Sequence, residues 1–257
     1  CGMNLIDVLR AGANGMVYTC VGIAAGLGLG VWLGRRLGLN RDTMYLVSVG
    51  TSICGGSAIA AAAPVLKAKA HDIAIASATV FTLNAVALLV FPAIGHALGF
   101  SATRFGYWAA LGIHDTSSVV GASFQYGPTA LEVGTTVKLA RALWIVPVTL
   151  FLSCCVAGRG ADEKRRIRIK IPWFIPGFLA AAALVTWIPA AAPAGSWLKE
   201  LAKYLMIATL FLNGANLSRE KLKELGFKPV LHGVTLWLIL AAGWCAAIHF
   251  GWVDCAR

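Results

Sequence analysis

Residues 44–66 form an apolar run long enough to cross a bilayer, and the sequence GTSICGGS at residues 50–57 interrupts the middle of it. A glycine inside a helix costs about 0.8–1 kcal/mol, and Ser and Thr hydroxyls offer the backbone competing hydrogen bonds. Backbone that leaves the helix at membrane depth must be satisfied by protein or by a water-filled cavity. One glycine would indicate close helix packing, but this cluster predicts a broken helix that binds a substrate or an ion.

The composition indicates that the rest of the chain also lies in a lipid bilayer. Its 257 residues are 58% hydrophobic and 13% charged, with a mean hydropathy of +0.75. Soluble domains carry about 25% charged residues, so we expect an integral membrane protein with the lipid bilayer as its main partner. The net charge of +11 does not indicate nucleic acid, because the basic residues fall in short loops between apolar runs. The seven cysteines lack CxxC spacing, and no metal or cofactor is expected.

Eight apolar spans are predicted, at residues 15–34, 43–66, 73–99, 105–126, 129–157, 173–191, 198–217 and 229–252. If every span crosses, the loops after the first, third, fifth and seventh lie on one side of the membrane. These loops carry 14 of the 22 Lys and Arg residues: Arg35, Arg36, Arg41, Arg104, Arg159, Lys164, Arg165, Arg166, Arg168, Lys170, Arg219, Lys221, Lys223 and Lys228. Cytoplasmic loops are rich in Lys and Arg, so we expect loop 159–170 in the cytoplasm, with Lys67, Lys69 and the C-terminus outside.

Two further spans carry polar interruptions. One contains HDTSS at residues 114–118, and another ends in NGAN at residues 213–216. At 1.5 Å per residue, His114, Asp115, Lys138 and Arg141 lie about 13–18 Å into their spans, near the bilayer midplane. Intramembrane ionisable residues indicate a functional site. A buried ion pair of Asp115 with Lys138 or Arg141 is the structural alternative, and it would still leave one positive charge over.

The order of the interrupted spans suggests an all-α fold of inverted five-helix repeats with crossing discontinuous helices. Residues 101–257 would form one complete repeat, whose fourth helix is the interrupted span 198–217. Residues 1–100 would form the last three helices of the other repeat, with span 43–66 again in fourth place. Because the chain opens at Cys1, we expect the first two helices of that repeat to precede it. Inverted repeats of this kind are typical of secondary transporters.

Four segments carry a resemblance to a known family. They are GTSICGGSAIA at 50–60 with Pro64 after it, HDTSSVV at 114–120, KLAR at 138–141 and IPWF at 171–174. These resemble the signatures of a bacterial membrane family labelled as sulfate exporters, and the resemblance extends from about Met3 over the chain. That family is similar in architecture to the superfamily of sodium–proton antiporters and bile-acid symporters. The resemblance implies a multi-pass transporter of the bacterial inner membrane, with the sulfate label less firmly implied than transport itself. Typical members are longer at the N-terminus by a few helices.

The leading hypothesis is a secondary active transporter of a small anion such as sulfate or a sulfonate. The second half of the broken helix would aim its N–H groups at the anion, two central cations would neutralise it, and the asparagines of span 198–217 would complete the site. The predicted substrate residues are Thr51, Ser52, Cys54, Gly55, Gly56, Ser57, Lys138, Arg141, Asn213 and Asn216. Proton or sodium coupling would use His114, Asp115, Thr116 and Ser117.

Other functions compete with this one. A sodium- or proton-coupled carrier of an organic acid is the main alternative. An enzyme is not expected, because a thiol nucleophile at Cys54 would need a base beside it and the sequence places none there. The chain has no Walker-type motif for ATP-driven pumping. A channel and a homo-oligomer both stay open at this level.

Overall fold

A computed structural model describes residues 5–157 and 226–253, together with isolated helical positions between 187 and 211. The side chains are described for residues 17–152 and 226–253 and at those isolated positions. Within these residues every regular element is a helix. Apart from those isolated positions, the predicted spans 173–191 and 198–217, with Asn213 and Asn216, lie outside the described residues.

Among the residues that the structure describes, four apolar helical segments are long enough to cross a membrane. They are residues 17–36 within α1 (Leu5–Arg36), α4 (Ala70–Ala97), the combined segment 128–152 of α7 (Pro128–Ala142) and α8 (Ile145–Ala157), and α12 (Phe227–His249). Their lengths of 20, 28, 25 and 23 residues exceed or match the roughly 20 residues that a bilayer core requires. The first, third, fifth and eighth predicted spans are confirmed as long apolar helices.

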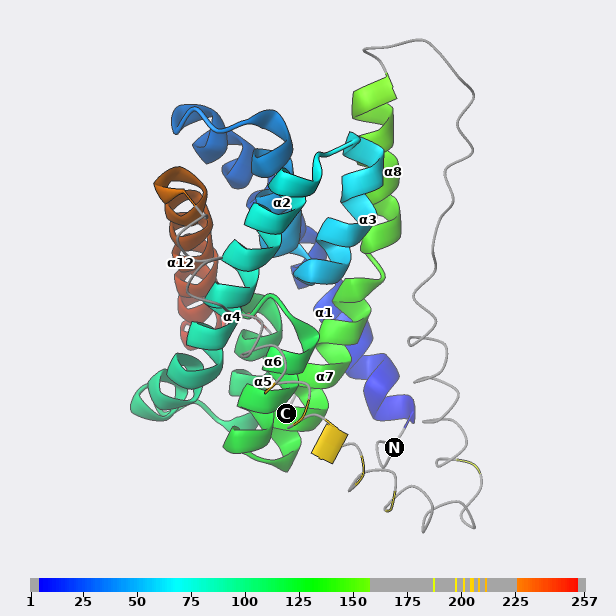
Figure 1. Cartoon of the computed structure of the whole chain (residues 1–257). Helices are drawn as coiled ribbons and strands as arrows, with labels where there is room; N and C mark the ends of the chain where they lie inside the picture. Colours follow the sequence, from blue (N-terminus) through cyan, green and yellow to red (C-terminus); the bar gives the residue numbers. More distant parts are fainter. Residues whose placement is uncertain are drawn as a thin grey trace.

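The predicted span 43–66 is a helical hairpin. Its first half is α2 (Arg41–Ser52), and its second half is α3 (Gly56–Leu66). The Asp72 carboxylate, near the start of α4, accepts hydrogen bonds from Thr43 Oγ1 at 2.7 Å and Asn40 Nδ2 at 2.9 Å. Since α4 begins just after α3 ends, the start of α2 and the end of α3 lie at the same end of the molecule. Figure 1 shows α2 running toward the middle and α3 returning beside α8.

The predicted span 105–126 forms a second hairpin, α5 (Ala102–Gly112) and α6 (Thr116–Tyr126). At the end of α6, Tyr126 donates to the Phe100 carbonyl at 2.6 Å, and its ring stacks on Phe105 with centroids 3.8 Å apart. The chain thus returns to the point from which α5 began. Both Phe105 and Tyr126 pack on Gly95 near the end of α4, whereas the first hairpin begins at the start of α4. The two hairpins therefore enter from opposite ends.

The expectation that span 43–66 crosses the membrane as a discontinuous helix, and that span 105–126 also crosses it, is wrong. Each half-helix has 11 or 12 residues, which is about 17 Å, or half of the hydrocarbon core. A broken crossing helix and a hairpin that enters and leaves on one side have the same length and hydropathy. Only the contacts of their ends tell the two arrangements apart.

The hairpins also change where the surface cations lie. One end of the described structure carries six of them: Arg35, Arg36, Arg41, Lys67, Lys69 and Lys228. At this end, Lys228 Nζ lies 3.8 Å from where a Cβ on Gly38 would be. Arg104 lies at the opposite end, so the expected sides of Lys67, Lys69 and Arg104 were wrong. The six cations gather at one end more clearly than predicted, and from the positive-inside rule we expect this end to face the cytoplasm.

A row of glycines lets α1 approach two other helices closely. Gly22, Gly26, Gly30 and Gly34 recur every fourth residue on one face of α1. A Cβ on Gly34, Gly30 or Gly26 would clash with α2 at Met44, Ser48 and Ser52 in turn. A Cβ on Gly22 would lie 2.8 Å from the Trp244 ring of α12. Small residues at four-residue spacing are the usual means by which membrane helices pack closely, and here they fix the first hairpin against α1.

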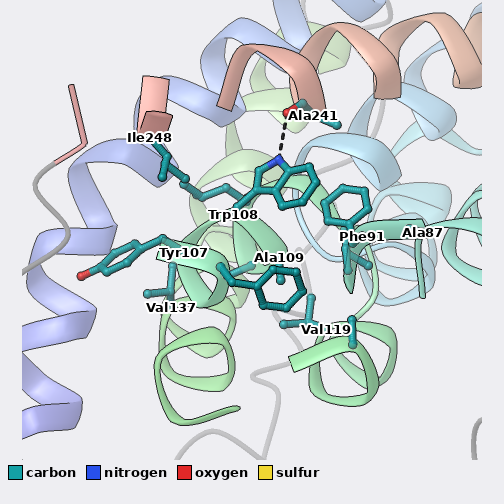
Figure 2. Close-up of a cluster of buried hydrophobic side chains, with 14 of the residues drawn as sticks. Ala87, Phe91, Tyr107, Trp108, Ala109, Val119, Val137, Ala241 and Ile248 are labelled. Carbon is teal, nitrogen blue, oxygen red and sulfur yellow. Dashed lines mark hydrogen bonds between the residues drawn. The ribbon is translucent and has the colours of Figure 1, made fainter. Parts of the chain in front are cut away.

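An aromatic core anchors the second hairpin (Figure 2). The Trp108 indole of α5 donates to the Ala241 carbonyl of α12 at 3.0 Å and stacks on Phe91 of α4, with centroids 4.1 Å apart. Closer to the end of α5, Trp237 Nε1 donates to the Gly112 carbonyl at 3.1 Å. The apolar ring surfaces are buried while both indole N–H groups keep a partner. Two long helices thus hold α5 in place up to its last residue.

Candidate functional site

The tips of the two hairpins meet beside the midpoint of α4. Asn84 lies in the middle of that 28-residue helix, and its Oδ1 accepts the backbone N–H groups of His114 at 3.1 Å and Asp115 at 3.2 Å. A Cβ placed on Gly55 would lie 3.7 Å from both Asn84 Nδ2 and Asp115 Cα. The tips 53–55 and 113–115 are therefore neighbours at the depth of the bilayer centre.

Each tip is a three-residue link between half-helices. In the first hairpin the reversal depends on Gly55, which has φ +66° and ψ −127°. Residues with a Cβ rarely adopt this conformation, whereas glycine does so readily. In the second hairpin Asp115 has φ −89° and ψ 144°, which is ordinary extended backbone. The interrupting glycine predicted from the sequence thus has a specific conformational role.

Lys138 bridges the two tips from α7. Its ammonium donates to the carbonyl oxygens of Ile113 at 2.6 Å, Ile53 at 3.2 Å and Ala110 at 3.4 Å. The side chain is fully buried, with an exposed fraction of 0%. Three carbonyl partners match the three N–H donors of the charged form. One carbonyl comes from the first hairpin and two come from the second, so Lys138 ties the hairpins together.

Arg141, one turn further along α7, does the same. Its Nε donates to the Ser52 carbonyl at 3.0 Å, and Nη2 donates to the same oxygen. Nη1 donates to the carbonyls of Leu111 at 2.6 Å and Ala110 at 3.2 Å. These carbonyls end α2 and α5, where a helix carries about −0.5 elementary charge. Both cations therefore stabilise the C-terminal ends of half-helices inside the membrane.

Asp115 has a different partner from the one that the ion-pair alternative requires. Its Oδ2 accepts the N–H groups of Ser117 at 3.0 Å and Ser118 at 3.3 Å, so it caps the N-terminus of α6. In the described part of the chain it forms no ion pair with either Lys138 or Arg141. The two cations bind carbonyl oxygens, and the carboxylate binds N–H groups.

The N-terminus of α3 has no such cap. Its N-cap residue is Gly55, which has no side chain to cap the helix, and among the described side chains only the Cys54 thiol interacts with a backbone N–H group here, that of Ala58. The backbone N–H groups at the start of a helix have no partner within the helix, and they carry about +0.5 elementary charge. The first hairpin thus lacks the negative group that Asp115 supplies to the second.

Several buried polar atoms at the tips have no partner in the described structure. They are Thr51 Oγ1, Asn84 Nδ2 and both ring nitrogens of His114, on side chains that are at most 3% exposed. Ser52 Oγ is also without a partner, but it faces Gly26 of α1. An unmade hydrogen bond of this kind costs about 1–3 kcal/mol. Such atoms are uncommon in native proteins unless water or a ligand satisfies them, so their concentration here marks a candidate binding site.

The structure brings most of the predicted site residues together at the two tips. Thr51, Ser52, Cys54, Gly55, Gly56 and Ser57 lie at the first tip and His114, Asp115, Thr116 and Ser117 at the second, with Lys138 and Arg141 between them. Asn84 was not predicted. Its only signal in the sequence is a lone amide in the middle of an apolar helix.

Comparison with known proteins places the chain in a family. A family model described as "Conserved hypothetical protein 698" matches residues 1–233. The chain belongs to this family. It is 54% identical to the UPF0324 membrane protein Bd1437 of Bdellovibrio bacteriovorus over 98% of this chain and 78% of that protein. It is 47% identical to the UPF0324 membrane protein GSU2818 of Geobacter sulfurreducens over 98% of this chain and 79% of that protein. No solved structure matches the chain significantly.

The relatives in this family, called the 698 family below, are named membrane proteins, which agrees with the four apolar helical segments. The names of these relatives specify no substrate. Sulfate export, the antiporter-like superfamily and the inverted repeat therefore stay predictions, although span 43–66 is not the crossing discontinuous helix that the predicted repeat assumed.

Proposed function

We propose that this member of the 698 family is a secondary active transporter that moves a small anion across the bacterial inner membrane. The observation that carries the proposal is the meeting of two half-membrane hairpins, from opposite ends, at a cluster of buried polar atoms without partners. Non-helical backbone at the midplane, with half-helix ends directed at a site, is the construction that secondary transporters use.

The charge of the site supports an anion. Among the described residues the two half-helix N-termini and two C-termini meet there, and their partial charges of about 0.5 each cancel. Lys138 and Arg141 contribute two positive charges and Asp115 contributes one negative charge. With a neutral imidazole at His114, one positive charge remains. An uncompensated charge in a low-dielectric interior is costly, and a bound anion would offset it.

The anion would bind at the N-terminus of α3. The N–H groups of Gly56 and Ser57 begin that helix beside Gly55, and helix N-termini are ready-made anion sites. Lys138 and Arg141 would act from a distance through their charge, because their N–H groups already have carbonyl partners. Thr51 and Cys54 would line the same tip, whereas the Ser52 hydroxyl faces Gly26 of α1. Asn213 and Asn216 would complete the site from outside the described residues.

Coupling to a proton or sodium gradient would involve the second tip. His114 is buried with both ring nitrogens unpaired, and Asp115 to Ser117 are half-buried beside it. An intramembrane carboxylate and imidazole are the groups that proton relays use. The same two residues favour the organic-acid carrier as the second candidate function, since that carrier would bind its coupling cation at Asp115.

Transport in proteoliposomes tests the proposal. We expect purified protein to take up labelled sulfate, methanesulfonate or a small carboxylate, driven by an imposed proton or sodium gradient, above the level of empty liposomes. Thr51→Val removes an unpaired buried hydroxyl at the tip and should slow uptake. Thr149→Val is the matched control, because the Thr149 hydroxyl already bonds carbonyls of its own helix. Folded protein that moves none of these anions under either gradient would refute the proposal.

A further inference from the structure

We propose that the site selects a singly charged oxyanion, such as a carboxylate or a sulfonate, over a dianion such as sulfate. In this assignment the Asn84 amide and the first N–H groups of α3 hold the charged group. The inference rests on the proposed function. It adds the charge of the substrate and names Asn84 as a residue that binds its charged group.

The two hairpins provide the first argument. In α6, a carboxylate oxygen from the residue before the helix accepts the N–H groups of Ser117 and Ser118. The position before α3 is Gly55, so the N–H groups of Gly56 and Ser57 have no side-chain cap in the described structure. The same helix end thus has a carboxylate in one hairpin and none in the other. A ligand oxyanion at α3 would make the contacts that Asp115 makes at α6.

Asn84 provides an independent argument. Its Oδ1 accepts two backbone N–H groups of the second tip, and this fixes the orientation of the amide, because an NH2 group could not accept them. Its Nδ2 therefore lies on the other side, 3.7 Å from where a Cβ on Gly55 would be. This nitrogen is buried and has no partner among the described residues, and the side chain is 3% exposed. An amide nitrogen can only donate, so its missing partner is an acceptor.

The charge balance determines how many charges the ligand carries. Lys138, Arg141 and Asp115 leave one positive charge once the four helix ends have cancelled. A monoanion brings the described part of the site to neutrality. A dianion would leave one net negative charge buried at the midplane, which is costly without a further cation. The site therefore favours a monoanion, or a dianion only when a cation accompanies it.

Two substitutions of nearly equal shape change this balance in opposite directions. Asn84→Asp keeps an oxygen for the N–H groups of the second tip but replaces the Nδ2 donor by a negative charge, which lowers the net charge of the site without ligand from +1 to zero. Asp115→Asn keeps an oxygen for the α6 cap and raises this net charge to +2. Asp42→Asn repeats the second chemical change in the first turn of α2, away from the tips, and is the matched control.

Binding of methanesulfonate, acetate and sulfate to the purified full-length proteins can be measured by anion-dependent shifts in the melting temperature and by competition in uptake. The unmodified protein should bind methanesulfonate or acetate more tightly than sulfate. Asn84→Asp should weaken the binding of these monoanions by about a hundredfold or more, because one added charge acts at short range in a poorly screened site. Asp115→Asn should raise the affinity for sulfate relative to methanesulfonate by about tenfold or more. Asp42→Asn should change neither.

The outcomes separate this inference from the proposed function. If anions are transported but sulfate binds best and Asp115→Asn leaves the preference unchanged, the charge-balance inference is wrong and the transporter stands. If no anion binds or moves, the proposed function itself fails. If Asn84→Asp strengthens and Asp115→Asn abolishes binding of sodium, the site holds a cation and the inference is wrong. Should Asn84→Asp not fold, the selectivity ratio of Asp115→Asn still decides the matter.

Discussion

The two hairpins have the same build and differ at one helix end. Each consists of two half-helices of 11 or 12 residues joined by a three-residue link. The second hairpin supplies its own negative group, the Asp115 carboxylate, to the N-terminus of α6. The first has Gly55 there, so no carboxylate caps α3 within the described structure. A helix end that is complete in one hairpin and incomplete in the other indicates which of the two tips receives a ligand.

The largest expected effect concerns the sides from which the hairpins enter. In a version without the seven native cysteines, single cysteines at Lys67 and Arg36 should both resist a membrane-impermeant thiol reagent in intact cells. A cysteine at Arg104 should react, because the second hairpin begins at the opposite face. If the Lys67 site reacts like the Arg104 site, residues 43–66 cross the membrane and do not form a hairpin that can be compared with the second one.

Loss of Arg141 should destabilise both hairpins together. Arg141→Ala leaves buried carbonyls of Ser52 and Leu111 without their charged donor, and we expect a loss of about 3 kcal/mol or more in the free energy of unfolding. Thermal unfolding in detergent measures this loss. Arg104→Ala removes an exposed arginine and should stay within about 0.5 kcal/mol. An Arg141→Ala variant as stable as the parent protein would show that its contacts with the tips are not structural.

Gly55→Ala should be costly through its backbone alone. A Cβ at this position meets no atom closer than 3.5 Å, but φ +66° with ψ −127° is a conformation that alanine rarely adopts. We expect a loss of about 1–3 kcal/mol, measured by the same unfolding assay. Gly28→Ala is the control, because Gly28 lies within helix α1 with nothing within 4 Å of its Cβ position, and it should be neutral or slightly stabilising. Equal effects of the two substitutions would contradict a special role for Gly55.

The smallest effect is expected at the corresponding residue of the second hairpin. Asp115→Ala removes a helix cap without backbone strain and should cost about 0.5–2 kcal/mol. Asp115→Asn keeps an accepting oxygen and should recover most of that stability. A much larger loss for Asp115→Ala than for Gly55→Ala would show that the second tip, and not the first, depends more on its N-cap position.

Local features of the sequence predicted the breaks well. Glycines and hydroxyls at 50–57 and the polar run at 114–118 stand out in apolar surroundings. The first helix break, at 53–55, falls within its segment, and the second, at 113–115, begins one residue before its segment. Lys138 and Arg141 stand out in the same way. Their partners could not be predicted, because backbone carbonyls exist at every residue and only the fold decides which of them end a helix.

The direction in which the chain continues after each break could not be predicted from the sequence. A polypeptide that continues across the bilayer and one that turns back bury the same apolar residues over the same length. The Asp72 contacts with Thr43 and Asn40 decide the matter, and they join residues about thirty positions apart. Asn84 escaped notice for a related reason, since a single amide acquires meaning only from the two tips that meet beside it.

The glycine row on α1 has a mechanical consequence. Met44, Ser48 and Ser52 of α2 face Gly34, Gly30 and Gly26 in turn, so both surfaces repeat every four residues. If α2 were displaced by one repeat, about 6 Å along the axis, Met44 and Ser48 would again face glycines, at Gly30 and Gly26. Ser52 would reach Gly22, where the Trp244 ring of α12 already packs. Any slide of the first hairpin along α1 by one helical turn would therefore require Trp244 to move aside.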